Sequence, residues 1–318
     1  MSEVNHQRIK TNGIWMHIAE QGTGPVVLLL HGFPEIWYSW RHQLNFLAHH
    51  GYRAIAPDLR GYGDSDSPLN PSSYTLLHFV GDLTGLLDHF NEQQAFVVGV
   101  DIGAVIGWHL SLLRPERVKG FVALGVPFFP RSPTVKTVES ITQIFGDGVH
   151  VAQFQEPGRA EQALARYDCL DVMKKFLLTR TDSLVAPPGM EIIDFLPTPS
   201  LLPSWVTEEE LMVFADKFQE SGFTGPLNYY RAMDLSWGLL APWDGSKITV
   251  PTKFIAGDKD IGFESGGTKD FVQGDLFRSL VTNLEVHIIE GGHHFIHQEK
   301  AQQVSDEILS FIRKLSLD

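Results

Sequence analysis

The sequence has 318 residues, 43% of them hydrophobic and 20% charged, and these proportions are typical of a globular protein with a large core rather than a disordered chain. The formal net charge of −13 argues against a nucleic-acid partner, because phosphate binding needs clustered lysine and arginine. A single cysteine excludes an intramolecular disulfide. The polar N-terminus, residues 1–6, and the lack of a long apolar run predict neither a secretion signal nor a membrane span, so we expect a cytoplasmic protein.

The predicted elements begin with an antiparallel ribbon. Residues 8–10 and 14–18 flank Asn12-Gly13, a pair typical of a tight hairpin because both central positions of the turn need a positive φ. Short apolar runs then alternate with helical patterns, and this alternation predicts a mostly parallel, doubly wound sheet. The expected strands are 26–30, 54–56, 96–98 and 118–124, and the expected helices are 40–49, 76–90 and 105–113.

The alternation stops near residue 129, where prolines begin to interrupt helical stretches. One helix in this region is well marked, because Thr207 and Glu210 have the spacing of a capping box. The strand pattern then returns, and an amphipathic helix closes the chain. The expected strands are 252–256 and 284–289, and the expected final helix is 304–315. The sequence therefore predicts an α/β core in two parts, 1–128 and 245–318, with a helical cap inserted at 129–244.

Asp101 lies between a predicted strand and a predicted helix, with Gly99 and Gly103 two positions to either side. A strand that turns sharply into a helix forces close backbone contacts at those two positions, where glycine fits. Such a turn would present Asp101 at the carboxyl end of the sheet, beside the positive end of the helix. This spacing predicts a nucleophile at Asp101; the alternative is an aspartate that only caps the helix.

Two later loops offer an acid and a base. Asp258 and Asp260 follow the strand expected at 252–256, and His293 and His294 follow the last strand. Parallel strands bring such loops to the edge of the sheet that carries Asp101. The order nucleophile, acid, histidine is that of the α/β hydrolases.

The motifs together resemble the soluble epoxide hydrolases of the α/β-hydrolase superfamily, and plant members most closely. The similar segments include 31–35, 58–65, 154–158, 204–205, 223–231 and 241–243. Alignment to this family favours Asp260 and His294 over their neighbours and implies that Tyr230 donates a proton to the epoxide oxygen. The segment 58–65 is expected to shape a turn rather than to take part in chemistry.

The same resemblance implies a substrate-binding loop at 31–35. In it the N–H of Phe33, together with that of Ile102, would stabilise the anionic intermediate. Pro34 and Glu35 would lie beside the substrate. For Glu35 two roles stay open, holding the hydrolytic water in a hydrogen-bond network or lying on the surface.

A carboxylate nucleophile limits the reaction. Attack on an ester would give an unproductive anhydride, whereas attack on an sp³ carbon gives an alkyl ester that a histidine-activated water can hydrolyse. The candidates are epoxide hydrolases and the haloalkane or haloacid dehalogenases. An epoxide opens to an alkoxide that needs a proton donor, and Tyr230 would supply one. Dehalogenases commonly have a tryptophan directly after the nucleophile, where this chain has Ile102. We therefore predict hydrolysis of a small-molecule epoxide to a vicinal diol, without cofactor or metal, by a monomer or homodimer.

Three residues depart from the family pattern: Ile102 replaces a tryptophan, Val100 replaces a histidine frequent in plants, and His150 replaces the second cap tyrosine. His150 could act as a donor with stronger pH dependence, because its ordinary pKa of roughly 6.5 is below the ~10 of tyrosine. Alternatively, Tyr230 acts alone. These departures keep open a divergent enzyme that transforms a specialised metabolite without net epoxide hydrolysis, a haloalkane dehalogenase, and, as the weakest hypothesis, a ligand receptor.

Overall fold

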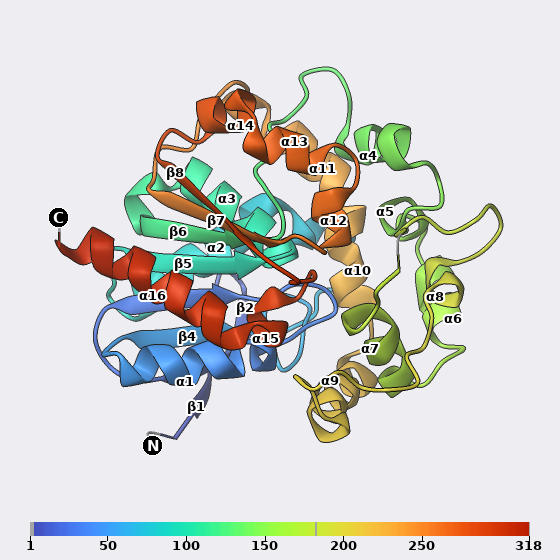
Figure 1. Ribbon diagram of the computed structural model, residues 1–318, viewed down its shortest axis with the longest axis horizontal. Coiled ribbons are helices and arrows are strands. Elements are labelled where there is room, and N and C mark those ends of the chain that lie inside the picture. Colours follow the sequence, from blue (N-terminus) through green and yellow to red (C-terminus); the bar gives the residue numbers. More distant parts are fainter. Residues whose placement is uncertain (1–2, 182, 318) are drawn as a thin grey trace.

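The computed structural model describes residues 3–181 and 183–317, so Met1 and Ser2, part of the polar N-terminus considered above, lie outside it. Within these residues the chain forms an eight-stranded sheet in the order β1-β2-β4-β3-β5-β6-β7-β8 (Figure 1). The pairs β1–β2 and β2–β4 are antiparallel and the others are parallel. The strands are β1 (Asn5–Thr11), β2 (Ile14–Gln21), β3 (Val26–Leu30), β4 (Arg53–Pro57), β5 (Ala95–Val100), β6 (Val118–Leu124), β7 (Thr252–Gly257) and β8 (Leu284–Ile289).

The first turn and the layers agree with the sequence pattern. Asn12 and Gly13 have φ values of 43° and 83°, which confirms the predicted hairpin between β1 and β2. Alternate residues of β3 enter two different cores: Leu28 packs in the cluster that includes α2 and α3, and Val27 in the cluster that includes α1 and α16. The predicted α/β-hydrolase fold is confirmed.

Helices cover both faces of the sheet, as its doubly buried strands require. The helix after Asp101 begins at Ile102 rather than at the predicted residue 105, because the turn passes directly from β5 into the helix. The α-helices of this part are α1 (Arg41–His49), α2 (Leu76–His89), α3 (Ile102–Leu113), α12 (Ile261–Glu264), α13 (Thr268–Gln273), α14 (Asp275–Leu280), α15 (Ile296–Glu299) and α16 (Ala301–Leu317). The 3-10 helices are η1 (Trp37–Trp40), η2 (Pro71–Tyr74) and η3 (Pro115–Arg117).

A group of helices separates β6 from β7 and lies together on one side of the sheet (Figure 1). They are α4 (Thr137–Phe145), α5 (His150–Gln153), α6 (Arg159–Leu164), α7 (Cys169–Leu177), α8 (Ile192–Phe195), α9 (Glu208–Ser221), α10 (Thr224–Arg231), α11 (Met233–Leu239) and η4 (Ala241–Trp243). The predicted capping box of α9 is confirmed, since Thr207 Oγ1 accepts from Glu210 N and Glu210 Oε2 accepts from Thr207 N. No helix among the described residues has both the length and the apolar character needed to cross a membrane.

Candidate active site

Asp101 occupies a sharp turn between β5 and α3, with φ 52° and ψ −121°. A Cβ on Gly103 would lie 2.1 Å from the Leu30 carbonyl oxygen, and one on Gly99 would lie 2.3 Å from Gly103 O. Both positions therefore need glycine, as the spacing predicted. The Asp101 side chain makes no capping hydrogen bond to α3, so the interpretation of Asp101 as a helix cap is wrong.

The structure brings Asp101, Asp260 and His294 together in a row. His294 Nε2 lies 3.2 Å from Asp101 Oδ2, and His294 Nδ1 lies 3.0 Å from each oxygen of Asp260. On the other side, Phe33 N donates to Asp101 Oδ1 at 2.9 Å. The side chains of Asp101 and His294 remain 22% and 27% exposed, whereas Asp260 is buried at 1%, so a small molecule can reach the first two.

The neighbouring candidates have other partners. Asp258 Oδ1 accepts from Gly291 N at 2.6 Å. The ring of His293 lies 3.0 Å from Glu299 Oε1, and its backbone N–H donates to Glu299 Oε2 at 2.8 Å. Of the two pairs considered above, Asp260 and His294 are the ones that the structure places beside Asp101.

The charges in this row stabilise one another. Burial would raise the pKa of Asp101, but the hydrogen bond and charge of His294 and the N–H groups of Phe33 and Ile102 hold it below the ordinary range. Burial would lower the pKa of His294, but Asp260 and Asp101 raise it well above its ordinary value. Both shifts favour the ionised carboxylate and the protonated imidazole.

Two helices of the inserted group bring Tyr230 and His150 to this site. Tyr230 is 4% exposed, and its ring packs edge-on against Phe33 at 5.7 Å and against His150 at 5.6 Å. Burial, and then the charge of Asp101, raises the pKa of Tyr230 well above its ordinary value, so the phenol keeps its proton. Burial lowers the pKa of His150 to about 4, although Asp101 opposes this change. A neutral imidazole retains one N–H, so the role of His150 as a donor stays a prediction.

Arg231 links these helices to one another, a role that its place in the sequence does not predict. Its Nη1 and Nη2 atoms donate to the two carboxylate oxygens of Glu161, each at 2.8 Å, and its Nε donates to Phe154 O at 3.1 Å. Gln155 Nε2 also donates to Tyr230 O at 3.1 Å. These contacts fix α5 and α6 against α10, and so fix His150 relative to Tyr230.

The remaining predicted residues line the loop after β3 and the turn after β5. Ile102 and Pro34 are buried, and the Ile102 N–H faces Asp101. Glu35 is fully buried, so the alternative of a surface role is wrong. Its carboxylate accepts from Gly32 N at 2.9 Å and from Gln298 Nε2 at 2.8 Å. The alternative in which Glu35 holds the hydrolytic water stays a prediction.

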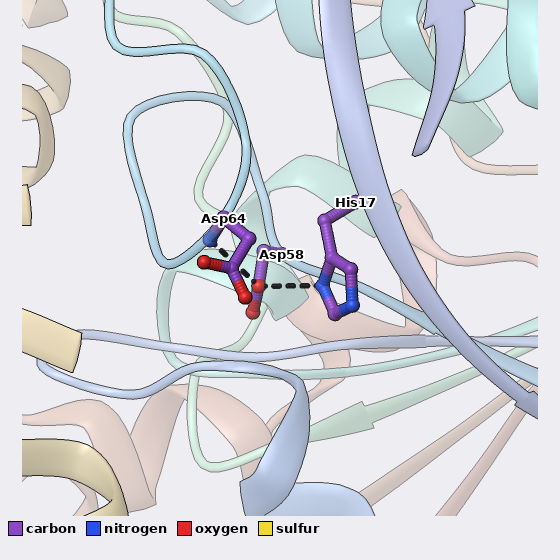
Figure 2. A group of neighbouring side chains, drawn as sticks. All are labelled: His17, Asp58 and Asp64. Atoms are coloured by element: carbon purple, nitrogen blue, oxygen red, sulfur yellow. Dashed lines mark hydrogen bonds and ion pairs between the residues drawn. The ribbon is translucent and has the colours of Figure 1, made fainter. Parts of the chain in front are cut away.

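His17, Asp58 and Asp64 lie close enough to contact one metal ion, with ligand atoms within 4.8 Å of one another (Figure 2). The Asp58 carboxylate already accepts from Trp37 N and Asp64 N and lies 2.7 Å from His17 Nδ1. The other ring nitrogen of His17 lies 3.1 Å from His6 Nδ1. These contacts brace the turn that was expected at 58–65, and they engage the Asp58 carboxylate and both ring nitrogens of His17.

Comparisons with known proteins extend over the whole fold. Residues 25–301 match the family described as alpha/beta hydrolase fold. The chain is 50% identical over 318 residues to Epoxide hydrolase 3 of Siraitia grosvenorii, covering 99% of this chain and 100% of the relative. It belongs to the epoxide hydrolases of the α/β-hydrolase family. This epoxide hydrolase is also 36% identical over 330 residues to Epoxide hydrolase A of Mycobacterium tuberculosis, covering 100% of both chains.

Solved structures of plant epoxide hydrolases have the same fold as this epoxide hydrolase. An enzyme from Vigna radiata is 47% identical with a TM-score of 0.94, and the match covers 98% of both chains. A mutant of potato epoxide hydrolase is 44% identical with a TM-score of 0.94, covering 98% of this chain and 100% of that one. The predicted resemblance to plant members is confirmed.

Proposed function

We propose that the enzyme converts an epoxide to a vicinal diol through an alkyl ester on Asp101, and that residues 129–244 act as a cap over this site. The observation that carries the proposal is the division of the Asp101 carboxylate between two kinds of partner. Oδ1 accepts the Phe33 N–H at 2.9 Å, while Oδ2 lies 3.2 Å from His294 Nε2 on a side chain that is 22% exposed. Oδ1 is thus held in place to become the carbonyl oxygen of the ester, and Oδ2 is available to attack the epoxide carbon.

In the first step Asp101 Oδ2 forms a bond to an epoxide carbon, and the bond from that carbon to the ring oxygen breaks. Tyr230 gives its proton to the ring oxygen, which becomes a hydroxyl. The neutral ring of His150 offers a second N–H to the same oxygen. The proton held by His294 then restores the Tyr230 phenol, so the ester stage has a neutral imidazole.

In the second step the neutral His294 takes a proton from water, and the hydroxide attacks Asp101 Cγ. Esterification has removed the Asp101 charge, one of the two carboxylate charges that raise the pKa of His294, so the imidazole can act as a base. The N–H groups of Phe33 and Ile102 stabilise the anion on Oδ1. The bond from Cγ to the alkyl oxygen then breaks; the diol takes one proton and His294 keeps the other.

The origin of the oxygen atoms tests the ester. In a single turnover in heavy-oxygen water, with enzyme in excess, we expect an unlabelled diol, because its new oxygen comes from Asp101. One heavy oxygen should appear in the peptide that contains Asp101, measured by mass spectrometry after digestion. Label in the diol of the first turnover would instead mean that water attacks the epoxide directly. A reaction without water, as in a divergent family member, would label neither.

Changing His294 to Gln should trap the ester, because the base for the second step is lost while Asp101 can still attack. We expect the intact mass of His294→Gln to rise by the mass of the epoxide. The double variant with Asp101→Asn is the matched control and should show no adduct. Incubation with a haloalkane tests the dehalogenase alternative, for which we expect no halide release.

A further inference from the structure

We propose that Gln298 is a positioning residue for ester hydrolysis, because it connects the loop that carries Phe33 to helix α9 of the inserted group through a continuous row of hydrogen bonds. This inference rests on the proposed ester mechanism. In this inference Gln298 does not contact the substrate. It only keeps the Phe33 N–H directed at Asp101 Oδ1.

The row has four hydrogen bonds. Arg41 Nε donates to Glu210 Oε1 at 2.8 Å, and Arg41 Nη1 donates to Gln298 Oε1 at 2.8 Å. Gln298 Nε2 donates to Glu35 Oε1 at 2.8 Å, and Glu35 Oε2 accepts from Gly32 N at 2.9 Å. Glu210 belongs to α9 and Gln298 to α15, so the row crosses from the inserted helices into the core.

The middle of this row is buried. Glu35 is 0% exposed and Gln298 is 2% exposed, so little water competes for their hydrogen bonds. The amide of Gln298 has one possible orientation, because Arg41 can only donate and the Glu35 carboxylate can only accept. Hydrogen bonds to charged groups are the stronger kind, and Gln298 makes one at each end of its amide.

The row ends at the group that stabilises the intermediate. Glu35 holds Gly32 N, and the next N–H along the chain, that of Phe33, donates to Asp101 Oδ1 at 2.9 Å. Without Gln298, Oε1 of Glu35 would keep only the ring of His297, whose Nε2 lies 3.2 Å away. We therefore expect the hydrogen bond from Phe33 N to Asp101 Oδ1 to weaken. Negative charge develops on Oδ1 during ester hydrolysis, so that step should slow more than ester formation.

Replacing Gln298 with Leu tests this inference through the steady-state parameters. In a two-step ester mechanism, slower hydrolysis lowers kcat and KM together and leaves kcat/KM unchanged. We expect both to fall about 10-fold, less than the loss from removing an oxyanion donor outright. The ester fraction at steady state, measured by intact mass after rapid quenching, should rise. Gln298→Glu, of equal length, should also lower kcat and KM together and raise the ester fraction, because it places a second carboxylate against Glu35.

Gln43 provides a matched control. It is also a fully buried glutamine, and its Nε2 donates to His297 O at 2.9 Å and to Ser305 Oγ at 3.2 Å, so it too supports α15. No hydrogen bond is described between Gln43 and Glu35. Gln43→Leu should lower the free energy of unfolding but leave KM and the ester fraction unchanged. Glu210→Gln, which retains an acceptor for the capping box, should give a smaller effect in the direction of Gln298→Leu.

The outcomes separate the two proposals. A fall in kcat at constant KM in both Gln298 variants, or an equal rise of ester in Gln43→Leu, would show that Gln298 is merely structural. An ester that forms in the unaltered enzyme, with an unchanged fraction in the Gln298 variants, would overturn this inference alone. The absence of ester both in the unaltered enzyme and in His294→Gln would overturn the proposed function, and this inference with it.

Discussion

Asp101 has a backbone conformation that residues with a Cβ rarely adopt, and at the residue scale this strain is what exposes its carboxylate. A φ of 52° with ψ of −121° costs about 1–3 kcal/mol, which the surrounding sheet and helix must offset. The two flanking glycines allow the close approach of β5, α3 and the end of β3. Alanine at either glycine would push this turn apart rather than fill a space.

Tyr230 is expected to act in ester formation, because the epoxide oxygen needs a proton in that step. Tyr230→Phe should therefore lower kcat/KM, by about 100-fold or more. This response differs from that expected of Gln298→Leu, which leaves kcat/KM unchanged. Steady-state kinetics measure both quantities.

Tyr229 is the matched control, because it precedes Tyr230 in α10 and is also 4% exposed. Tyr229→Phe should keep kcat/KM within about 2-fold, because the proposed mechanism draws no proton from this phenol. Equal activity in the unaltered enzyme and Tyr230→Phe would show that another group, such as His150, supplies the proton.

The residues that sequence patterns could predict are those whose signal is local in the chain. Asp101 was predicted from glycines two positions away, and Thr207 from a glutamate three positions away. Gln298 and Glu35, by contrast, are 263 residues apart, and Arg231 and Glu161 are 70 apart. Nothing in the spacing of such pairs indicates that they meet, because the topology of the sheet brings them together.

At the scale of elements, hydrophobic patterning worked best for strands buried on both faces. The predicted bounds of β3 and β6 agree with the structure. Helices α5 and α8 span four residues each, too few for a 3.6-residue period to be visible. The arrangement of the inserted helices depends on contacts such as the Arg231–Glu161 ion pair, so their positions could not be predicted from periodicity.

The capping box of α9 supports a prediction about this element. Thr207→Ala removes the acceptor for Glu210 N, leaving that N–H to water, and should lower the free energy of unfolding by about 1 kcal/mol. Urea unfolding followed by circular dichroism measures the loss. Thr207→Ser retains a hydroxyl and should remain close to the unaltered protein. A loss of equal size in Ser and Ala would mean that the Thr207 methyl group, not the cap, stabilises the helix.

At the scale of the molecule, the order of parallel strands explains how distant segments form one site. The loops after β3, β5, β7 and β8 all leave the carboxyl edge of the sheet, and they carry the Phe33 N–H, the Asp101 carboxylate, Asp260 and His294. The insertion between β6 and β7 leaves from the same edge and returns α10, the helix that contains Tyr230, to it (Figure 1). One topological rule therefore accounts for the core residues, whereas the inserted helices add Tyr230, the proposed proton donor.

Histidines with shifted pKa values should make the stability of the whole protein depend on pH in two directions. Burial lowers the pKa of His31, and lowers that of His150 to about 4, so below the ordinary histidine pKa of about 6.5 the unfolded chain binds protons that the folded chain does not. The free energy of unfolding should therefore fall as the pH falls from 6.5 toward 4. Asp260 and Asp101 raise the pKa of His294, so its contribution is complete below 6.5 and is lost as the pH rises through the raised value.

Replacing His150 with Phe tests the acid side of this dependence. Phenylalanine takes up no proton in either state, so the variant should lose less stability than the unaltered protein between pH 6.5 and 4.5, as measured by urea unfolding. Above pH 7 the two curves should run parallel, because both retain His294. Parallel curves on the acid side as well would mean that His150 titrates at its ordinary pKa in the folded enzyme. In that case its ring would gain charge as the pH falls through about 6.5, and below that pH it could not serve as the neutral second donor proposed for the epoxide oxygen.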